Sequence, residues 1–425
     1  SAVYYLQEVS EGQFEIYFGD GVVSKKLSDG NIVILKCVVT NIDEANGAFA
    51  FTNSGAINTV VNVTTTTLEV ASGGAAAETV QSIKLSAPLD YASQGRCVTT
   101  NDYKVFVQKL YPNATAIQVF GGENGSFDSS LGVVATAEYG KVFISVRNNL
   151  GTNLTEAEKT GLVSQLGKFT VASITPVIVD PDFMYVLLTC DFKYDSSATV
   201  KTKDTLVTEV TSTIINYNTT ELVKFDAILR HSKLLSLIDA TDSSITSSSV
   251  NPRLAKYFTP IKGESKSYNL YYNNALYNPH VGHNSAMGGI LTSTGFYVSG
   301  TNSTSEQFFD DDGNGNLRLY YLTGATRNYT NETAGTVNYL TGAVAINNII
   351  ITSISNVDGV TSNRIRIVVL PRSNDIVALR NQILEIDTVN TKVTGGVDTI
   401  AVGDEGGAAN FSATSAGVDA TGTSY

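Results

Sequence analysis

The chain has 425 residues, of which 42% are hydrophobic and 16% are charged, and its formal net charge at neutral pH is −12. This composition supplies apolar residues for roughly two to four packed domains and excludes a disordered chain, a collagen and a coiled coil. The excess of acidic residues argues against a nucleic-acid-binding surface, which needs clustered Lys and Arg. The aliphatic runs, such as Ile32–Leu35, are far shorter than the roughly 20 residues of a membrane-spanning helix, so no membrane insertion is expected.

Residues 1–87 are predicted to form a β-rich domain. Phe14, Ile16 and Phe18 alternate with polar residues, and the segment 19–21 supplies a tight Gly-Asp-Gly turn. β-Branched residues then predict strands at 32–39, 58–63 and 64–70. A Gly/Ala-rich segment at 72–77 predicts a hinge or loop.

Residues 88–195 are predicted to form an α/β domain. A short helix is expected to end at Leu110, with its cap among Thr100, Asn101 and Asp102. A second helix is expected after Thr155, because Glu158 three residues later completes a capping box. Strands are predicted at 116–120, 140–146, 175–179 and 184–192. The order of these elements resembles a split βαβ unit.

The segment 196–255 is predicted to connect the α/β domain to the last domain through two helices. Apolar residues recur at helical spacing in 203–217 and 231–238. The second helix is expected to end before the Ser-rich stretch 243–249, and β character is expected to return after Pro252.

Residues 256–400 are predicted to form a β-rich C-terminal domain, followed by a low-complexity tail at 401–425. Candidate strands lie at 268–272, 295–298, 317–322, 337–340, 344–351 and 364–369. The predicted fold class is therefore a β-dominated, multidomain α+β protein with an α/β middle domain.

Three cysteines, Cys37, Cys97 and Cys190, are an odd and widely spaced set. Such spacing predicts neither a disulfide framework nor a zinc site. We expect buried thiols in a protein that folds in a reducing compartment. The chain starts at Ser1 without a secretory leader, which suggests a fragment.

The three histidines are the first candidates for chemistry near neutral pH. His231 is predicted to lie at the start of a helix, where capping or solvation is the expected role. His280 and His283 lie close together in a loop, but no nearby Cys or acidic cluster completes a metal site.

The acidic segment 310–316 is the best candidate for an ion site. Asp310, Asp312 and Asn314 match the first ligand positions of a calcium-binding loop, but Tyr321 stands where a bidentate Glu is required. A strand is also predicted to follow, in place of a helix. The preferred interpretation is an acidic hairpin turn.

Motifs for phosphate binding and nucleophilic catalysis are missing. Gly161 and Gly167 have the wrong spacing for a phosphate-binding loop, Phe169 replaces its hydroxyl residue, and a helix is expected to lead in. No Gly-x-Ser-x-Gly motif occurs. The sequence therefore predicts no catalytic, cofactor-binding or metal-binding residue, and its 21 Tyr favour a role in protein interfaces.

A set of motifs distributed over most of residues 1–390 indicates a family. They are Phe14–Gly21, Lys25–Asn31, Asn41–Ala48, Arg96–Tyr103, Ile117–Glu123, Tyr139–Val146, Asp311–Tyr320, Asn374–Val377 and Arg380–Leu384. Together they resemble the large baseplate wedge proteins of T-even-type contractile-tailed phages, within the wider baseplate-J-like group. The N-terminal helical region of that family has no counterpart here, which again suggests a truncated chain.

The resemblance implies a structural virion protein and no enzyme. Such a protein is a late protein, assembled in the host cytoplasm into the tail baseplate. It pairs as a homodimer, binds other wedge proteins including the sheath-initiating one, and links wedges into a ring around the central hub. The ring then takes part in the rearrangement that triggers sheath contraction, genome ejection and entry. The resemblance implies no cofactor, nucleic acid, membrane insertion or small-molecule substrate.

The part after residue 256 is expected to supply the dimer contact, because it is rich in Tyr and in candidate strand edges. Two alternatives remain open. The chain could be a β-rich receptor-binding or adhesin module of a phage tail, or a tail-associated glycosidase with paired acids.

Overall fold

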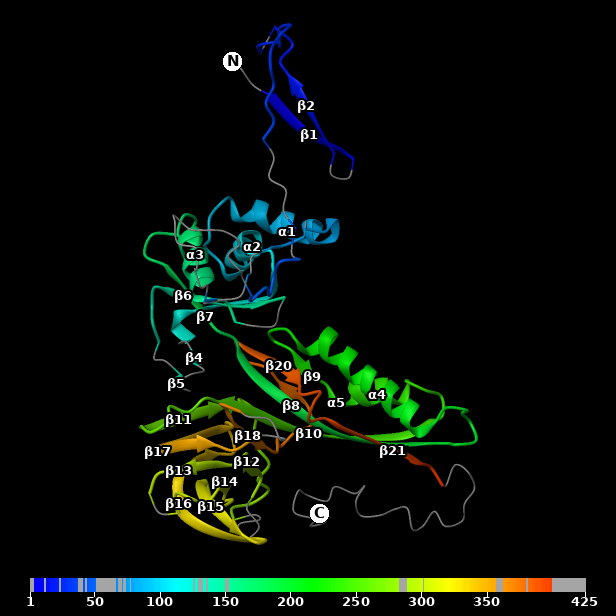
Figure 1. Cartoon of the computed structure of the whole chain (residues 1–425), viewed down its shortest axis with the longest axis vertical. Coiled ribbons are helices and arrows are strands. Elements are labelled where there is room, and N and C mark those ends of the chain that lie inside the picture. Colours follow the sequence, from blue (N-terminus) through cyan, green and yellow to red (C-terminus); the bar gives the residue numbers. More distant parts are fainter. Residues whose placement is uncertain are drawn as a thin grey trace, which may run out of the picture.

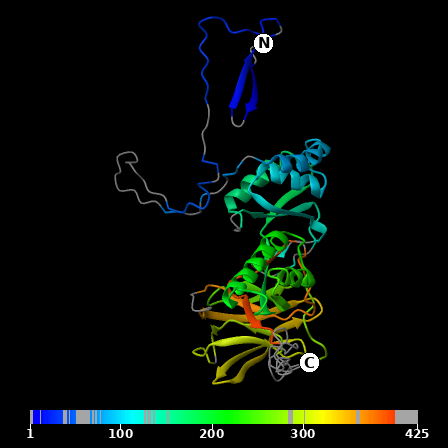
Figure 2. The same cartoon turned by 90° about the vertical axis from the view of Figure 1, so that its right-hand side faces the viewer.

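The fold is known from a computed structural model, and strands predominate in it over helices. The residues described are 4–10, 13–22, 24–36, 41–42, 44–50, 66–67, 71, 74–76, 78–124, 127–128, 133–134, 137–149, 153–282, 289–300, 302–356, 362–379 and 381–399. A hairpin, an α/β unit, a helix-covered sheet and a barrel follow one another along the long axis (Figures 1 and 2). The predicted β-dominated, multidomain α+β class is confirmed.

The N-terminal element is an antiparallel hairpin of β1 (Tyr4–Ser10) and β2 (Gln13–Phe18). The alternation predicted from Phe14 to Phe18 is confirmed as β2. The strand predicted at 32–39 is wrong over residues 32–36, which form no strand. Their apolar side chains are exposed and have no partner strand, and β propensity alone does not form a strand. The predicted strand 58–63, and most of 64–70 and 72–77, lie outside the described residues.

Helix α1 (Val80–Ser93) was not expected, since residues 1–87 read as β structure and Pro88 as a break. Its N-terminus is capped by Thr79, whose hydroxyl accepts a hydrogen bond from the Ser82 amide. Its last turn ends at Gln94, which has left-handed backbone geometry. Pro88 lacks one helical N–H donor, but it lies on an exposed helix where water can satisfy the freed carbonyl.

The α/β unit follows α1. Its elements are α2 (Thr100–Leu110), β3 (Ala114–Gly121), a 3₁₀ turn (Gly122–Asn124), β4 (Phe127–Asp128), β5 (Val133–Val134), β6 (Lys141–Asn148), α3 (Glu156–Leu166) and β7 (Thr175–Val179). The main strands have the order β3-β6-β7, with β3 antiparallel and β7 parallel to β6. The helices cover this sheet around a core that includes Tyr103, Phe106, Ile144 and Leu166.

Two predictions about this unit need correction. Strands β6 and β7 are direct neighbours, so the unit is a βαβ motif with an antiparallel strand beside it and is not split. The strand predicted at 184–192 extends to β8 (Asp182–Tyr194) and belongs to the next sheet. Local sequence patterns identify a strand but do not say which sheet it joins.

The central sheet has the order β12-β18-β10-β8-β20, and β21 pairs with the distal part of β8. Its strands are β8, β10 (Ile245–Phe258), β12 (Leu291–Ser293), β18 (Ile365–Val369), β20 (Gln382–Ile386) and β21 (Lys392–Val397). The sequence predicted a return of β character only after Pro252, but β10 begins at Ile245, so it includes most of the Ser-rich stretch and Pro252 itself. Because β8 pairs with β10 over most of its length, the pairing outweighs the weak local β signal of serine.

Helices cover one face of this sheet (Figure 1). They are α4 (Lys203–Tyr217), which continues as a π-helical turn (Asn218–Leu222), and α5 (His231–Asp239). Both helices were predicted, and their apolar stripes are buried against the sheet. A small ladder of β9 (Ile228–Leu229) and β19 (Ile376–Val377) lies beside them.

The last unit is an antiparallel barrel. Its strands are β11 (Ser265–Tyr271), β13 (Phe296–Val298), β14 (Gln307–Asp311), β15 (Asn316–Thr323), β16 (Thr326–Asn338) and β17 (Ala343–Ile354). They have the order β11-β17-β13-β14-β15-β16, and β16 pairs back to β17, which closes the sheet. Gly335 permits this closure, because a Cβ there would collide with the backbone of Ala345.

The barrel and the central sheet share one hydrophobic core, which runs from Met184 to Ile386 in the sequence. Strand β10 runs through residue 255, where the sequence suggested a domain boundary. The predicted division into five domains therefore stays a proposal. Any boundary near residue 255 has to be reconciled with the core that the central sheet and the barrel share.

Candidate functional site

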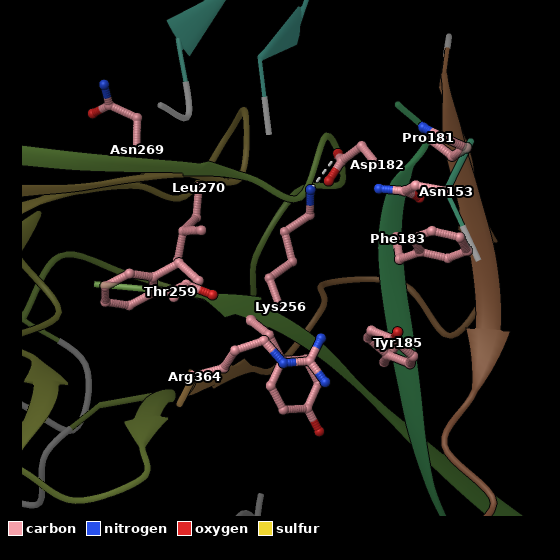
Figure 3. Close-up of a pocket in the computed structure, with 12 residues that line it drawn as sticks. Asn153, Pro181, Asp182, Phe183, Tyr185, Lys256, Thr259, Asn269, Leu270 and Arg364 are labelled. Atoms are coloured by element: carbon pink, nitrogen blue, oxygen red, sulfur yellow. Dashed lines mark hydrogen bonds and ion pairs between the residues drawn. The ribbon is translucent and has the colours of Figure 1, made fainter. Parts of the chain in front are cut away.

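The candidate site is a cavity of about 320 Å³ where the α/β unit, the central sheet and the barrel meet (Figure 3). Strand β8 supplies Asp182, Phe183 and Tyr185, and β10 supplies Lys256. Arg364 precedes β18 and lies at the opposite wall. Sequence spacing gave no signal for this site, because its walls come from segments that only the sheet pairings bring together.

A buried ion pair forms the floor of the cavity. The Lys256 ammonium donates to the Asp182 carboxylate, and both side chains are buried (Figure 3). Gln382 lies opposite Asp182 in the parallel pairing of β20 with β8, and its Nε2 donates to Asp182 Oδ2 at 2.8 Å. Burial lowers the pKa of Lys256, against the attraction of Asp182. Two internal donors, Lys256 Nζ and Gln382 Nε2, thus converge on Asp182 Oδ2, as is typical of a structural ion pair.

Aromatic rings form a second wall. The rings of Tyr185 and Tyr257 meet edge to face at 5.2 Å, and the Arg364 guanidinium lies 5.0 Å from the centre of the Tyr257 ring. Burial raises the pKa of both tyrosines, so they stay neutral phenols. Of the described residues that line the cavity, Asp182 is the only carboxylate. The described lining of this cavity thus offers one carboxylate, whereas a glycosidase uses two acids about 5 to 9 Å apart.

Beside the cavity, a few polar contacts fix the α/β unit to the central sheet. Arg147 on β6 donates from Nη1 to the Val223 carbonyl oxygen at 3.3 Å and lies 4.0 Å from the Glu385 carboxylate. Gln118 on β3 donates from Nε2 to Asp226 Oδ2 at 3.0 Å. These specific side chains join two units whose buried cores form separate clusters among the described residues.

The histidines lie apart from this cavity. The His231 amide donates to Asp375 Oδ1 at 2.9 Å, and its Nε2 lies 2.8 Å from the Val250 carbonyl oxygen, so the side chain ties α5 to β10. His280 is exposed, with Nδ1 3.3 Å from the Val281 carbonyl oxygen. His283 lies outside the described residues.

The acidic segment is a hairpin turn between β14 and β15, as predicted. Asp312 Oδ1 accepts hydrogen bonds from the Asn314 and Asn316 amides at 2.7 and 2.9 Å, and Oδ2 accepts from Asn316 Nδ2 at 2.6 Å. Although burial opposes the change, these donors lower the pKa of Asp312. Its oxygens therefore organise the turn itself.

The two carboxylates before the turn are buried and point to different partners. Asp310 bonds Arg318 at 2.9 Å, Arg327 at 2.8 Å and the Tyr329 hydroxyl at 2.9 Å. Asp311 accepts from the Ile290 amide at 2.7 Å and from the Tyr339 hydroxyl at 2.6 Å. Both carboxylates join neighbouring segments of the barrel and do not converge on one point.

The remaining candidates are structural. Gly161 lies inside α3, so a helix leads into Gly167, as predicted. Cys97 and Cys190 are buried and free, and burial raises the pKa of their thiols to about 11 and about 12. Both thiols thus stay protonated and unreactive. Cys37 lies outside the described residues.

Two features are absent from the described residues. No group of three or more His, Cys, Asp and Glu side chains is placed to hold a metal ion there. In the same part of the chain, no helix has both the length and the apolar character needed to cross a membrane.

The exposed apolar surface of the hairpin is a second feature that the sequence did not indicate. Tyr4, Leu6, Phe14, Ile16 and Phe18 lie on one side of the β1–β2 ladder, and we call them the hairpin face. Leu6 and Phe14 are 57% and 60% exposed. An isolated two-stranded hairpin is marginally stable in water, and among the described residues no further strand extends this sheet.

Comparison with known families agrees with these units. Residues 99–179 match the family "Baseplate structural protein gp6, C-terminal domain I", and residues 182–257 match "Baseplate structural protein gp6, C-terminal domain III". The first range covers the elements from α2 to β7, and the second covers those from β8 to β10. The two matches meet at Asp180 and Pro181, where the chain passes from the α/β unit into the central sheet.

A curated relative is also a baseplate protein. Baseplate wedge protein gp6 of Enterobacteria phage T4 is 24% identical over 304 residues, which cover 65% of this chain and 43% of that protein. The chain thus spans less than half of the length of this relative. A chain in the cryo-EM structure of the anti-feeding prophage baseplate covers 59% of this chain and 56% of itself at 12% identity. Its TM-score of 0.29 is too low to indicate a shared overall fold.

One assignment follows from three findings. They are the order of the two matched domains, the agreement of these domains with the structural units, and the curated relative. Residues 99–179 and 182–257 are similar to two C-terminal domains of the gp6 baseplate structural proteins, and the chain as a whole is similar to a baseplate wedge protein of a contractile phage.

Proposed function

We propose that this chain homodimerises in the baseplate wedge, joins wedges into a ring around the central hub, and takes part in the rearrangement that triggers sheath contraction. It binds other wedge proteins, including the one that initiates the sheath. The observation that supports this function is the consecutive match of residues 99–179 and 182–257 to two domains of one baseplate family. Its work consists of contacts with other subunits and involves no catalysis.

The basis for a dimer contact in the C-terminal part differs from the one expected from sequence. The barrel is closed, so most of its strands have partners on both sides. Strand β11 ends the strand order and pairs only with β17 among the described strands. Antiparallel pairing of β11 with its copy across a two-fold axis would place the same surface on both partners, as a dimer requires.

The test is the mass of the purified full chain. Sedimentation equilibrium over a wide concentration range should show a monomer–dimer equilibrium, and hydrogen exchange of the β11 amides should slow as the dimer forms. A strict monomer at high concentration, with unchanged exchange in β11, contradicts the dimer.

Binding to other wedge proteins needs a separate test. Native mass spectrometry of the chain mixed with purified wedge proteins should give a complex of defined stoichiometry. If every wedge protein is recovered free, the scaffold role is wrong.

A further inference from the structure

One face of the central sheet carries basic and aromatic side chains that are not part of the core. Along β8, the even-numbered residues from Met184 to Tyr194 are buried in the hydrophobic core, whereas the odd-numbered residues from Phe183 to Lys193 are partly or fully exposed. Successive side chains of a strand point to opposite sides of the sheet. The odd-numbered residues therefore define a second face, opposite the one that the helices cover, and we call it the outer face.

The strand register extends the outer face across the neighbouring strands. Leu187 pairs with Arg253 of β10, and Thr189 pairs with Lys392 of β21. Paired residues of adjacent strands point to the same side of a sheet. Lys193, Lys392 and Arg253 therefore follow one another along the outer face, starting from the distal end of β8.

These three basic groups lack acidic partners. In the described part of the chain, neither Lys193, Arg253 nor Lys392 forms an ion pair with a carboxylate. Asp191 is exposed and is the only acid among the odd-numbered residues of β8. Burial lowers the pKa of the half-buried Arg253, and no described anion opposes this change. A desolvated guanidinium without a counter-ion is costly, so this part of the outer face favours an added carboxylate.

The other end of the outer face is aromatic and borders the cavity. Tyr185 and Tyr257 lie there edge to face. The carboxylates at this end are already in contact with other groups, since Glu385 lies 4.0 Å from the Arg147 guanidinium and Asp387 accepts from the Tyr257 hydroxyl at 3.4 Å. The unmatched charge is therefore concentrated at the distal end. A surface of Arg and Tyr is typical of the centre of a protein interface.

The chain itself supplies an acidic segment at the distal end. Strand β21 ends at Val397, which pairs with Tyr194 next to Lys193. The residues after Lys392 contain no basic residue and four acidic ones, which are Asp398, Asp404, Glu405 and Asp419. The segment that leaves the sheet beside the basic end of the outer face thus has the opposite charge.

The spacing of the acids matches the distance to Arg253. Leu187, opposite Arg253, lies seven residues before Tyr194 on β8, which corresponds to about 23 Å. Asp404 and Glu405 follow Val397 by seven and eight residues, so an extended chain carries them about 23 to 26 Å. The two strand spacings between β21 and β10 add a sideways offset of about 10 Å, part of which the long Arg side chain covers.

We propose that the acidic pair Asp404–Glu405 folds back over the outer face of its own chain and binds Arg253 and Lys392. Gly403 and Gly406 flank the pair, and glycine permits the reversal of direction that this path requires. Carboxylates form strong, charge-assisted hydrogen bonds with guanidinium groups. In this position the segment shields a surface of the type that binds partner proteins. The inference is independent of the proposed dimer and wedge contacts.

Disulfide formation in the full chain tests this contact. All variants carry Cys37→Ser, because Cys97 and Cys190 are buried. Gly406→Cys retains both acids, and Asn251→Cys lies on the outer face opposite Thr189. Under mild oxidation we expect a disulfide within one chain, identified by mass spectrometry of the unreduced peptides.

The matched control moves the second cysteine to the other side of the sheet. Ser212→Cys, exposed on α4, takes the place of Asn251→Cys and should react about fivefold more slowly or less. Equal rates for the two positions overturn the proposal, because an unbound segment would sample both sides of the sheet alike.

Charge supplies a second readout. Neutralising the pair by Asp404→Asn and Glu405→Gln should lower the rate about fivefold, whereas Asp419→Asn should leave it within about twofold. Arg253→Glu should also lower the rate, and the combination of Arg253→Glu with Asp404→Lys and Glu405→Lys should restore it. A rate that does not respond to neutralisation overturns the proposal. The neutralised segment leaves the folded sheet unchanged, so this arm holds even if Arg253→Glu does not fold.

The remaining occupant is the segment of a second copy. Two differently tagged chains, one with Gly406→Cys and one with Asn251→Cys, are mixed and oxidised at several concentrations. A link that forms only between chains, and rises with concentration, overturns packing within one chain. Failure of this contact is separable from failure of the proposed function, because the β11 dimer is measured by sedimentation and exchange in chains that retain the natural residues at 251 and 406.

Discussion

The N-terminal hairpin and the C-terminal barrel are both antiparallel and both rich in aromatic side chains, yet they place these side chains in opposite environments. In the barrel, Phe296 and Phe309 are fully buried with ring centres 4.8 Å apart. In the hairpin, Tyr4 and Phe14 face solvent. The barrel closes on itself through β16 and β17, whereas the hairpin is a two-stranded sheet that no other described strand joins. Closure, and not composition, thus decides which apolar residues stabilise the chain and which remain free to bind partners.

The largest loss of stability is expected when the buried ion pair of Asp182 and Lys256 is broken. Asp182→Asn leaves the Lys256 ammonium buried without a counter-ion, which should cost about 3 to 5 kcal/mol of unfolding free energy. Denaturant unfolding followed by tyrosine fluorescence measures the loss. The double variant Asp182→Leu, Lys256→Met removes both charges and should recover most of the stability. Equal loss in single and double variants would mean that the pair itself is not what stabilises this site.

The comparison between barrel and hairpin is sharpened by a matched pair of substitutions. Phe296→Ala removes a fully buried ring and should lower the free energy of unfolding by about 3 to 4 kcal/mol. Phe14→Ala removes an exposed ring and should change it by less than about 0.5 kcal/mol. Thermal unfolding of the two variants side by side is the measurement. A large loss of stability for Phe14→Ala would break the comparison, because the hairpin would then belong to the folded body.

An intermediate effect is expected in the α/β unit. Thr155 caps α3, with its hydroxyl accepting from the Glu158 amide at 3.3 Å and the Glu158 carboxylate accepting from the Thr155 amide at 2.9 Å. Thr155→Ala should cost about 1 kcal/mol. Hydrogen exchange resolved to α3 and β6 reports the local loss. Thr155→Ser retains the hydroxyl and should behave like the natural chain, and protection that is equal in the Ala and Ser variants would rule out the cap.

The smallest effect depends on pH. Lys201 at 2.7 Å and the Ser244 hydroxyl and amide at 2.7 and 2.9 Å bind the Asp242 carboxylate and lower its pKa to about 2. A lowered folded-state pKa adds stability above the ordinary value, near 4, and that stability is lost as the pH falls toward 2. Lys201 is partly exposed, so the contribution is about 1 kcal/mol or less. Urea midpoints of Asp242→Asn and the natural chain should differ at pH 6 and converge near pH 2. A constant gap would contradict this assignment.

Local elements could be predicted where the sequence carries its own signals. The capping box at Thr155 and the stripe of Leu206, Val210 and Ile214 identified α3 and α4, and the alternation at Phe14 identified β2. The acidic turn after β14 was also predicted, since Asp and Asn side chains satisfy nearby amides. These signals operate within a few residues of one another.

Features that depend on long-range pairing could not be predicted. Asp182 and Lys256 meet only because β8 and β10 pair in one register, and nothing near either residue specifies that register. Pro252 suggested the start of a β region but lies inside a paired strand. The closed barrel depends on the close approach of the Ala345 backbone to Gly335, which has no Cβ to block it, and composition does not reveal this contact. The exposure of the hairpin face was missed because alternation predicts a strand and not whether a second layer covers it.

The long pairing of β8 with β10 has a mechanical consequence. The thirteen residues of β8 extend over about 43 Å, and the adjoining ladder with β10 covers most of that length. A pull along the strand direction loads these hydrogen bonds in shear, so they resist together, whereas a pull at a turn opens a ladder one rung at a time. Opposite pulls on β8 and β10 along the strand direction therefore load this ladder in shear, with the α/β unit attached at one end of that axis.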